Sequence, residues 1–185
     1  MALIVSVAGS PSAPSRSLAV LEYSKAFFAQ KEHTVQIVNL RDLDAVELLH
    51  GHYDGSTITP VLAQIAQAAG VILATPVYKA SYTGILKAFL DVMPAGALAG
   101  KAVLPIALGG SAAHSLVIDY ALRPVLMALG AALALPGVYL IDSQLDYKDG
   151  QLNGFVVPEA ETRLTAALND LVHTIARITN SNEGA

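Results

Sequence analysis

The chain has 185 residues, a formal net charge of −4, 54% hydrophobic and 14% charged residues, and no cysteine. This length suits one domain with its own hydrophobic core, and the missing cysteine excludes disulfides and catalytic thiolates. Because no basic stripe is visible and aromatic residues are few, we expect no nucleic acid partner.

The high hydrophobic fraction has two explanations: a membrane-spanning segment, or extensive burial that includes a subunit interface. A spanning helix needs about 20 consecutive apolar residues, and Lys, Gly or Pro interrupts every apolar run sooner, as in MALGAALALPGVYLI. The start, MALIVSV, lacks the basic region of a signal peptide. We therefore expect no membrane association, a cytoplasmic location and a homo-oligomer.

Short apolar runs rich in β-branched residues alternate with longer amphipathic runs along the chain. The short runs predict buried strands and the longer ones predict helices, in the order βαβαβαβαβα. The expected strands are 3–8, 33–40, 71–78, 102–110 and 137–142, and the expected helices are 16–31, 60–70, 84–93, 115–130 and 158–178, with a further short helix at 43–49.

Strands that are apolar on both faces and separated by helices predict a parallel sheet covered on both sides. Five such strands favour a three-layer α/β/α arrangement with the flavodoxin-like strand order 2-1-3-4-5. We expect one domain over residues 1–179 and a disordered tail over residues 180–185.

The fold class predicts where a ligand binds. Open α/β sheets bind ligands beyond the carboxyl ends of their strands, where the strand order reverses. For the order 2-1-3-4-5 this point lies between the first and third strands, so the loops 9–17, 76–84 and 109–115 should converge. These loops are rich in Gly, Ser, Tyr, Lys and His.

The first loop, in VAGSPSAPSRS, leads from a strand into a helix. Helix N-termini bind anions through unpaired N–H groups, and the hydroxyls of Ser10, Ser15 and Ser17 and the charge of Arg16 would add to such a site. The loop matches neither GxGxxG nor GxxxxGK[ST], which disfavours Rossmann dinucleotide and Walker A sites. A plain helix cap and turn remains the alternative.

The second loop, TPVYKASYTGILK, offers the aromatic faces of Tyr78 and Tyr82 and the cation of Lys79, so that a planar ring could rest there. Alternatively, both tyrosines belong to an interface or the edge of the core. In the third loop, GGSAAH, Gly109 and Gly110 permit close backbone approach. His114 is a lone histidine, and a structural role is favoured for it.

Three stretches together resemble a known family: GSPSAPSRS, ATPVYKASYTGILKAFLD and LPIALGGSAAHSLVIDYALRPVL. They resemble the NAD(P)H-dependent FMN reductases of flavodoxin-like fold, and most closely the sulfonate-assimilation type that supplies an alkanesulfonate monooxygenase. The resemblance extends over residues 3–145. It implies an oxidoreductase that transfers a hydride from NADPH, or NADH, to FMN and releases reduced flavin for a flavin-dependent monooxygenase.

The same resemblance assigns roles to residues of the three loops. It implies no catalytic acid or base and no metal, because the cofactor carries the hydride step. At the position after Gly-Ser-Pro the family often has an arginine linked to pyridine-nucleotide phosphate, whereas this chain has Ser12, so both NADPH and NADH stay open. The implied residues are Ser10, Ser15, Arg16 and Ser17 for the FMN phosphate, Pro76, Val77, Tyr78, Lys79, Tyr82 and Gly84 around the ring, and Gly109, Gly110, Ser111 and His114 beside it.

The segment DYALRPVL carries a further implication of the resemblance. Tyr120 would lie in a π-bulge at a tetramer interface close to the flavin, and π-bulges are frequent at functional sites. The nearly all-round apolar character of residues 116–129 favours this interface, and hence a tetramer over a dimer. The alternative is a buried tyrosine in a helix that Pro124 kinks.

Three other functions compete with the FMN reductase. A quinone or azo-dye reductase with tightly bound FMN shares the first loop. A flavodoxin-type electron carrier usually has a stronger acidic charge than −4. A non-catalytic flavin-binding module would bind FMN without turnover. NADPH oxidation with added FMN distinguishes the two reductases from the last two.

Overall fold

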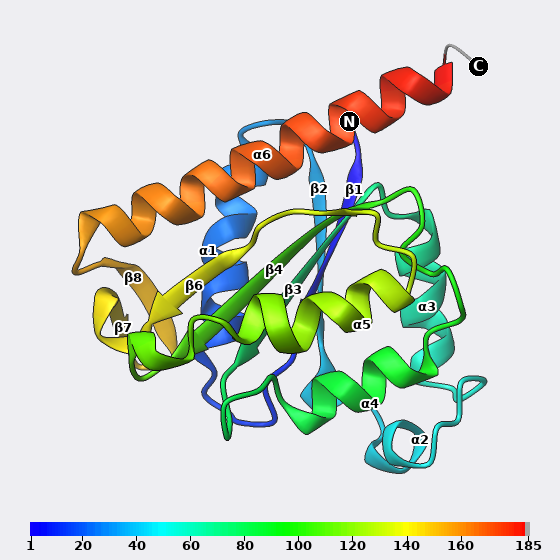
Figure 1. Cartoon of the computed structure of the whole chain (residues 1–185), viewed down its shortest axis with the longest axis horizontal. Helices are drawn as coiled ribbons and strands as arrows, with labels where there is room; N and C mark the ends of the chain where they lie inside the picture. Colours follow the sequence, from blue (N-terminus) through cyan, green and yellow to red (C-terminus); the bar gives the residue numbers. More distant parts are fainter. Residues whose placement is uncertain (184–185) are drawn as a thin grey trace.

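A twisted parallel sheet runs through the molecule with helices on both faces (Figure 1). The computed structural model describes residues 1–183. The strand order is β2-β1-β3-β4-β5, with β6 also paired to β4, which confirms the predicted flavodoxin-like order. The strands are β1 (Leu3–Ala8), β2 (Thr34–Asn39), β3 (Gly70–Pro76), β4 (Ala102–Gly109), β5 (Leu133–Ala134) and β6 (Val138–Ile141).

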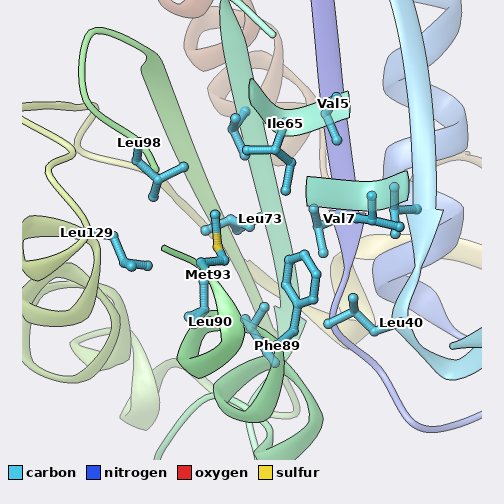
Figure 2. Packing of buried hydrophobic residues seen from close by; sticks show 14 of the residues in the cluster. Val5, Val7, Leu40, Ile65, Leu73, Phe89, Leu90, Met93, Leu98 and Leu129 are labelled. Atoms are coloured by element: carbon cyan, nitrogen blue, oxygen red, sulfur yellow. The ribbon is translucent and has the colours of Figure 1, made fainter. Parts of the chain in front are cut away.

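Two hydrophobic clusters lie on opposite faces of the sheet. Side chains of β1 alternate between them: Val5 and Val7 face one cluster and Ile4 the other. Figure 2 shows Val7 and Leu73 on the face that also packs Phe89. The helices are α1 (Arg16–Ala29) and α6 (Pro158–Glu183) on one side, α3 (Ile58–Gln67), α4 (Gly84–Val92) and α5 (Arg123–Ala128) on the other, and the short α2 (Ala45–Leu49) beside α4.

The fifth position of the sheet is a strand in two pieces, whereas the sequence predicts one strand at 137–142. β5 pairs with Ala102 and Val103, and β6 pairs further along the same edge of β4. Gly137 follows the gap with φ of +88°, and a Cβ there would come within 2.7 Å of the Pro105 carbonyl oxygen. The chain therefore leaves the sheet and re-enters it where only glycine fits.

The gap between β5 and β6 is held by one arginine. The Arg123 guanidinium donates to the carbonyl oxygens of Ala134, Leu135 and Pro136 at 3.2, 3.1 and 3.0 Å. We expect Arg123→Met to lower the free energy of unfolding in urea by about 2–3 kcal/mol, because these carbonyls lose a charged donor. Asp119→Asn is the control: it removes only the 3.0 Å surface pair with Arg123, so a loss below about 1 kcal/mol is expected. Equal losses in the two variants would contradict this account.

The sequence predicts one regular helix over 115–130, and this prediction is wrong because the segment is not a continuous α-helix. A short turn (Ala112–His114) precedes this segment, which contains a π-helical turn (Ile118–Leu122) and then α5. Pro124 has no N–H to donate and its ring crowds the carbonyl four residues back, so the preceding turn widens. The structure thus confirms the π-bulge around Tyr120, and it leaves Tyr120 78% exposed rather than buried.

Residues 145–155 form a β-hairpin that was not predicted. β7 (Leu145–Lys148) and β8 (Gln151–Phe155) pair antiparallel next to α1 (Figure 1). Asp149 and Gly150 form its turn with φ of +53° and +84°, the pattern of a two-residue hairpin turn.

The last helix extends further than expected. α6 reaches Glu183, so it includes residues 180–183 of the segment predicted to be disordered, while residues 184–185 lie outside the described residues. None of the described helices combines the length and the apolar character that crossing a membrane requires.

Candidate functional site

A cavity of about 280 Å³ opens where the loops after β1, β3 and β4 meet. This is the predicted end of the sheet, at the switch point between β1 and β3. The volume is near the ~300 Å³ lower bound typical of small-molecule sites. The lining residues are Ser10, Ser12, Pro14, Ser15, Arg16, Ser17, Pro76, Val77, Tyr78, Leu108, Gly109, Gly110 and Asp142.

The first loop brings three serines and one cation to the cavity. Ser10, Ser15 and Ser17 are only 3%, 9% and 1% exposed, although all three are polar. Ser15 caps α1 by accepting from the Leu18 N–H at 3.3 Å, and its Oγ lies 2.9 Å from that of Ser17. The loop is therefore both a helix cap and a cluster of hydroxyls. Its first-turn N–H groups have no carbonyl four residues back in the helix, so this end of the cavity suits an anion.

The second loop turns sharply beside the cavity. Tyr78 and Ser81 exchange two backbone hydrogen bonds, of 2.9 and 3.1 Å. Lys79 and Ala80, between them, have φ of +51° and +63°, a region that costs residues other than glycine about 1 kcal/mol or more. Such strain persists where the surroundings impose it, and it is frequent at ligand sites. Tyr78 also approaches the first loop, with its Oη 3.2 Å from Ser12 Oγ.

Tyr139 of β6 holds the third loop in place. The Tyr139 hydroxyl donates to the Ser111 carbonyl at 2.7 Å. Burial, with a smaller contribution from the charge of Asp142, raises the pKa of this phenol, so it stays a donor at neutral pH. A Cβ on Gly109 would overlap the Tyr139 hydroxyl. The glycine therefore leaves room for the Tyr139 hydroxyl, which fixes the loop.

Buried hydroxyls connect the first loop to the second. Thr83 Oγ1 donates to the Gly9 carbonyl at 2.5 Å and accepts from the Leu86 N–H at 3.3 Å, capping α4. The Thr83 N–H in turn donates to Thr75 Oγ1 at 3.2 Å. These bonds hold the ends of β1 and β3 in a fixed relation.

Thr83→Val should therefore lower the free energy of unfolding and weaken ligand binding in the cavity. The valine is nearly isosteric but leaves the buried Gly9 carbonyl without its donor, which costs about 1–3 kcal/mol. Urea unfolding and ligand titration of the same sample measure the two effects. Thr83→Ser keeps the hydroxyl and should stay close to wild type; a serine variant as weak as the valine variant would show that packing, not the hydrogen bond, matters.

Several predicted site residues lie outside this cavity. Lys79 sits at the tip of the second loop, and the half-buried Tyr82 packs on the core, where burial raises its pKa. Gly84 lines a separate apolar hollow with Pro11 and Arg41. His114 and Tyr120 line a further hollow with Ala80, and Ser111 contributes its carbonyl to Tyr139.

Sequence reasoning missed four residues of the cavity wall: Ser12, Pro14, Leu108 and Asp142. Ser12 and Pro14 belong to a loop already chosen, so their inclusion needed only the rule that the whole loop lines the site. Asp142 follows β6, and the carboxyl ends of all strands meet at this edge. That rule would also have found Asp142.

The cavity has the donor set that a flavin mononucleotide needs. Its hydroxyls, helix N-terminus and guanidinium suit a phosphate, and the exposed Tyr78 with Gly109 and Gly110 lines another part of the cavity, where an aromatic face and backbone suit a ring system. Riboflavin lacks the phosphate that the hydroxyls and the guanidinium would bind, and the first loop lacks the glycine fingerprint of a Rossmann dinucleotide site.

Comparisons with known proteins agree with this chemistry. Residues 2–146 match the family model described as NADPH-dependent FMN reductase. The chain is 45% identical over 175 residues to an FMN reductase (NADPH) of Pseudomonas putida KT2440, covering 95% of this chain and 89% of that protein. An FMN reductase (NADPH) of Escherichia coli K12 is 42% identical, with 94% and 90% covered. The solved apo structure of an NADH:FMN oxidoreductase (EMOB) is 37% identical, with a TM-score of 0.82 and 96% and 90% covered.

Proposed function

This chain belongs to the NADPH-dependent FMN reductase family, and from that membership we propose that it reduces FMN with NADPH and releases the reduced flavin. The observation that carries the proposal is the convergence of buried serines, Arg16 and the Gly109–Gly110 backbone in one cavity at the switch point of the sheet. The two FMN reductases compared above, matched over 89% and 90% of their length, are named for NADPH, and the solved oxidoreductase is named for NADH. We propose NADPH as the donor because the two relatives of higher identity carry its name.

Different residues of the cavity would bind the phosphate and the ring of FMN. Ser10, Ser15, Ser17 and Arg16 would hold the phosphate, and Val77, Tyr78, Gly109 and Gly110 would lie beside the ring. When FMN is bound, its ring accepts the hydride from the nicotinamide and a proton from solvent completes the reduced form. The chain's part is to orient the reactants and keep an open face to the nicotinamide, so no side-chain acid or base is needed.

Release of the reduced flavin is supported by features that limit affinity. Arg16 is exposed, so water competes for its N–H groups, and the carboxylate of Asp142 lines the same cavity. A negative charge there opposes a phosphate dianion. We propose that the reduced flavin passes to a separate flavin-dependent monooxygenase, of the sulfonate type by the resemblance of the three loops.

We also propose that the chain forms a homotetramer in the cytoplasm. Leu116, Tyr120 and Met127 are 60%, 78% and 53% exposed along the π-helical turn and α5, and a second copy would cover this apolar strip. Sedimentation velocity of the wild type and of Tyr120→Asp tests it. A tetramer that the aspartate dissociates is expected; a wild-type monomer would contradict the proposal. Cell fractionation tests the location.

The test of release is the anaerobic yield of reduced FMN. Protein freed of flavin is mixed with excess NADPH and FMN, passed through a membrane that retains protein, and the filtrate is assayed. Reduced FMN in the filtrate far above the protein concentration is expected. Reduced flavin that stays with the protein at one per chain, and that a quinone or azo dye then reoxidises, would favour the quinone reductase instead.

A further inference from the structure

A cation–π contact links the predicted phosphate loop to the unpredicted hairpin. The guanidinium carbon of Arg16 lies 4.8 Å from the centre of the Tyr147 ring on β7. We propose that Tyr147 is a positioning residue for the flavin phosphate: it holds Arg16 at the mouth of the cavity and thereby helps the protein select a phosphorylated flavin. The inference rests on the proposed function, because it assumes that Arg16 faces that phosphate.

The hairpin is built to support the phosphate loop. A Cβ on Gly150 in its turn would lie 3.5 Å from Pro14 Cβ, which is ordinary van der Waals contact. The β7–β8 register shifts between Asp146 and Tyr147, and such bulges re-aim side chains. Tyr147 also packs on the hydrophobic cluster under α1 and α6. Its ring is therefore fixed by the core before it meets Arg16.

The N–H groups of the Arg16 guanidinium are available to bind a phosphate. Among the described residues 1–183 it forms no ion pair, unlike Lys87 and Arg123, which pair with Asp91 and Asp119. A guanidinium that stacks by its face on an aromatic ring keeps its N–H groups, which lie in its plane, free for a phosphate. Without the ring, an exposed arginine would sample many rotamers and lose entropy on binding.

The ring, not the hydroxyl, does this positioning. The Tyr147 Oη is buried and has no hydrogen-bond partner in the described part of the chain. An unpartnered buried hydroxyl adds no stability. Tyr147→Phe should consequently fold at least as well as wild type, which makes it the matched control for a variant that lacks the ring.

The experiment compares FMN with riboflavin, which differs from FMN only in lacking the phosphate. Dissociation constants for both are measured by flavin fluorescence quenching with the full-length protein. Tyr147→Leu should weaken FMN binding about fivefold, the value of an exposed cation–π contact, and leave riboflavin binding unchanged. Tyr147→Phe should keep the wild-type preference for FMN. Phe27→Leu removes the ring of a separate cation–π contact, with Lys31 at 5.1 Å, and should also keep this preference.

Three results would overturn the inference. A Tyr147→Leu protein with the wild-type FMN preference would show that the ring does not act on the phosphate, and an equal loss in Tyr147→Phe would show that the hydroxyl, not the ring, acts. A uniform loss of both flavins would mean a structural role only. Failure of the proposed function looks different: wild-type protein would then bind FMN no better than riboflavin or would not oxidise NADPH.

Discussion

Replacing Gly109 by alanine should lower kcat/KM for FMN about 10–100-fold, the scale on which a small misplacement at a binding site acts. The new Cβ would overlap the Tyr139 hydroxyl, so β4, the tyrosine or the third loop must move. Overpacking of this kind also costs about 1–3 kcal/mol of unfolding free energy. Steady-state kinetics and urea unfolding of the same preparation measure both effects.

A second substitution identifies the cause of the Gly109→Ala defect. Tyr139→Phe removes the overlapping hydroxyl, and the next nearest atom to the new Cβ is the ring Cζ at 3.3 Å, which is tight but tolerable. The phenylalanine alone should cost about 1 kcal/mol because the Ser111 carbonyl loses its donor. Gly109→Ala with Tyr139→Phe should therefore bind FMN better than Gly109→Ala alone. If the double variant is worse than either single one, the overlap is not the cause.

Replacing Arg16 by methionine should weaken FMN binding about tenfold and leave riboflavin binding unchanged. A charged hydrogen bond to a phosphate is worth about 1.5–3 kcal/mol, and the exposure of Arg16 places the effect at the lower end. Methionine keeps the length of the side chain, so packing on the Tyr147 ring is largely retained. Fluorescence titration with both flavins measures the change.

Salt and a conservative variant sharpen the Arg16 prediction. Added salt should weaken FMN binding more in wild type than in Arg16→Met, because salt screens the charge of Arg16 and the variant lacks that charge. Arg16→Lys keeps the charge but loses the planar fork and should fall between the two. Equal losses of FMN and riboflavin in Arg16→Met would place Arg16 away from the phosphate.

The periodicity of the sequence predicts the sheet well because each strand of a parallel sheet is buried on both faces. The runs LIVSVA and VILATPVY are apolar except for Ser6, Thr75 and the tyrosine hydroxyl for this reason, and the switch point then follows from strand order alone. The edge of the sheet could not be predicted in the same way. The path from β5 to β6 depends on Gly137 beside Pro105 and on the three carbonyls that Arg123 caps, which are contacts between residues distant in sequence.

The hairpin at 145–155, unlike the path from β5 to β6, has a local sequence pattern that could have predicted it. LDYKDGQLNGF holds the Asp-Gly pair that is typical of two-residue hairpin turns, but the expectation of loops between strands and helices hid it. In the cavity, Ser10, Ser15, Arg16 and Ser17 of the first loop were predicted because hydroxyls and a cation at a helix N-terminus suit an anion. Tyr139 was missed because its role is a hydrogen bond to the Ser111 carbonyl, and no local pattern reports such a bond.

The measurement that tests the central claim most directly is steady-state NADPH oxidation by protein freed of flavin, with FMN, FAD and riboflavin varied separately. We expect the rate to saturate with FMN, at many turnovers per chain, and to be lower with riboflavin at equal concentration because the phosphate site stays empty. NADPH oxidation that does not respond to added FMN, or that requires a quinone or azo dye, would contradict the account of this chain as an FMN reductase that releases its product.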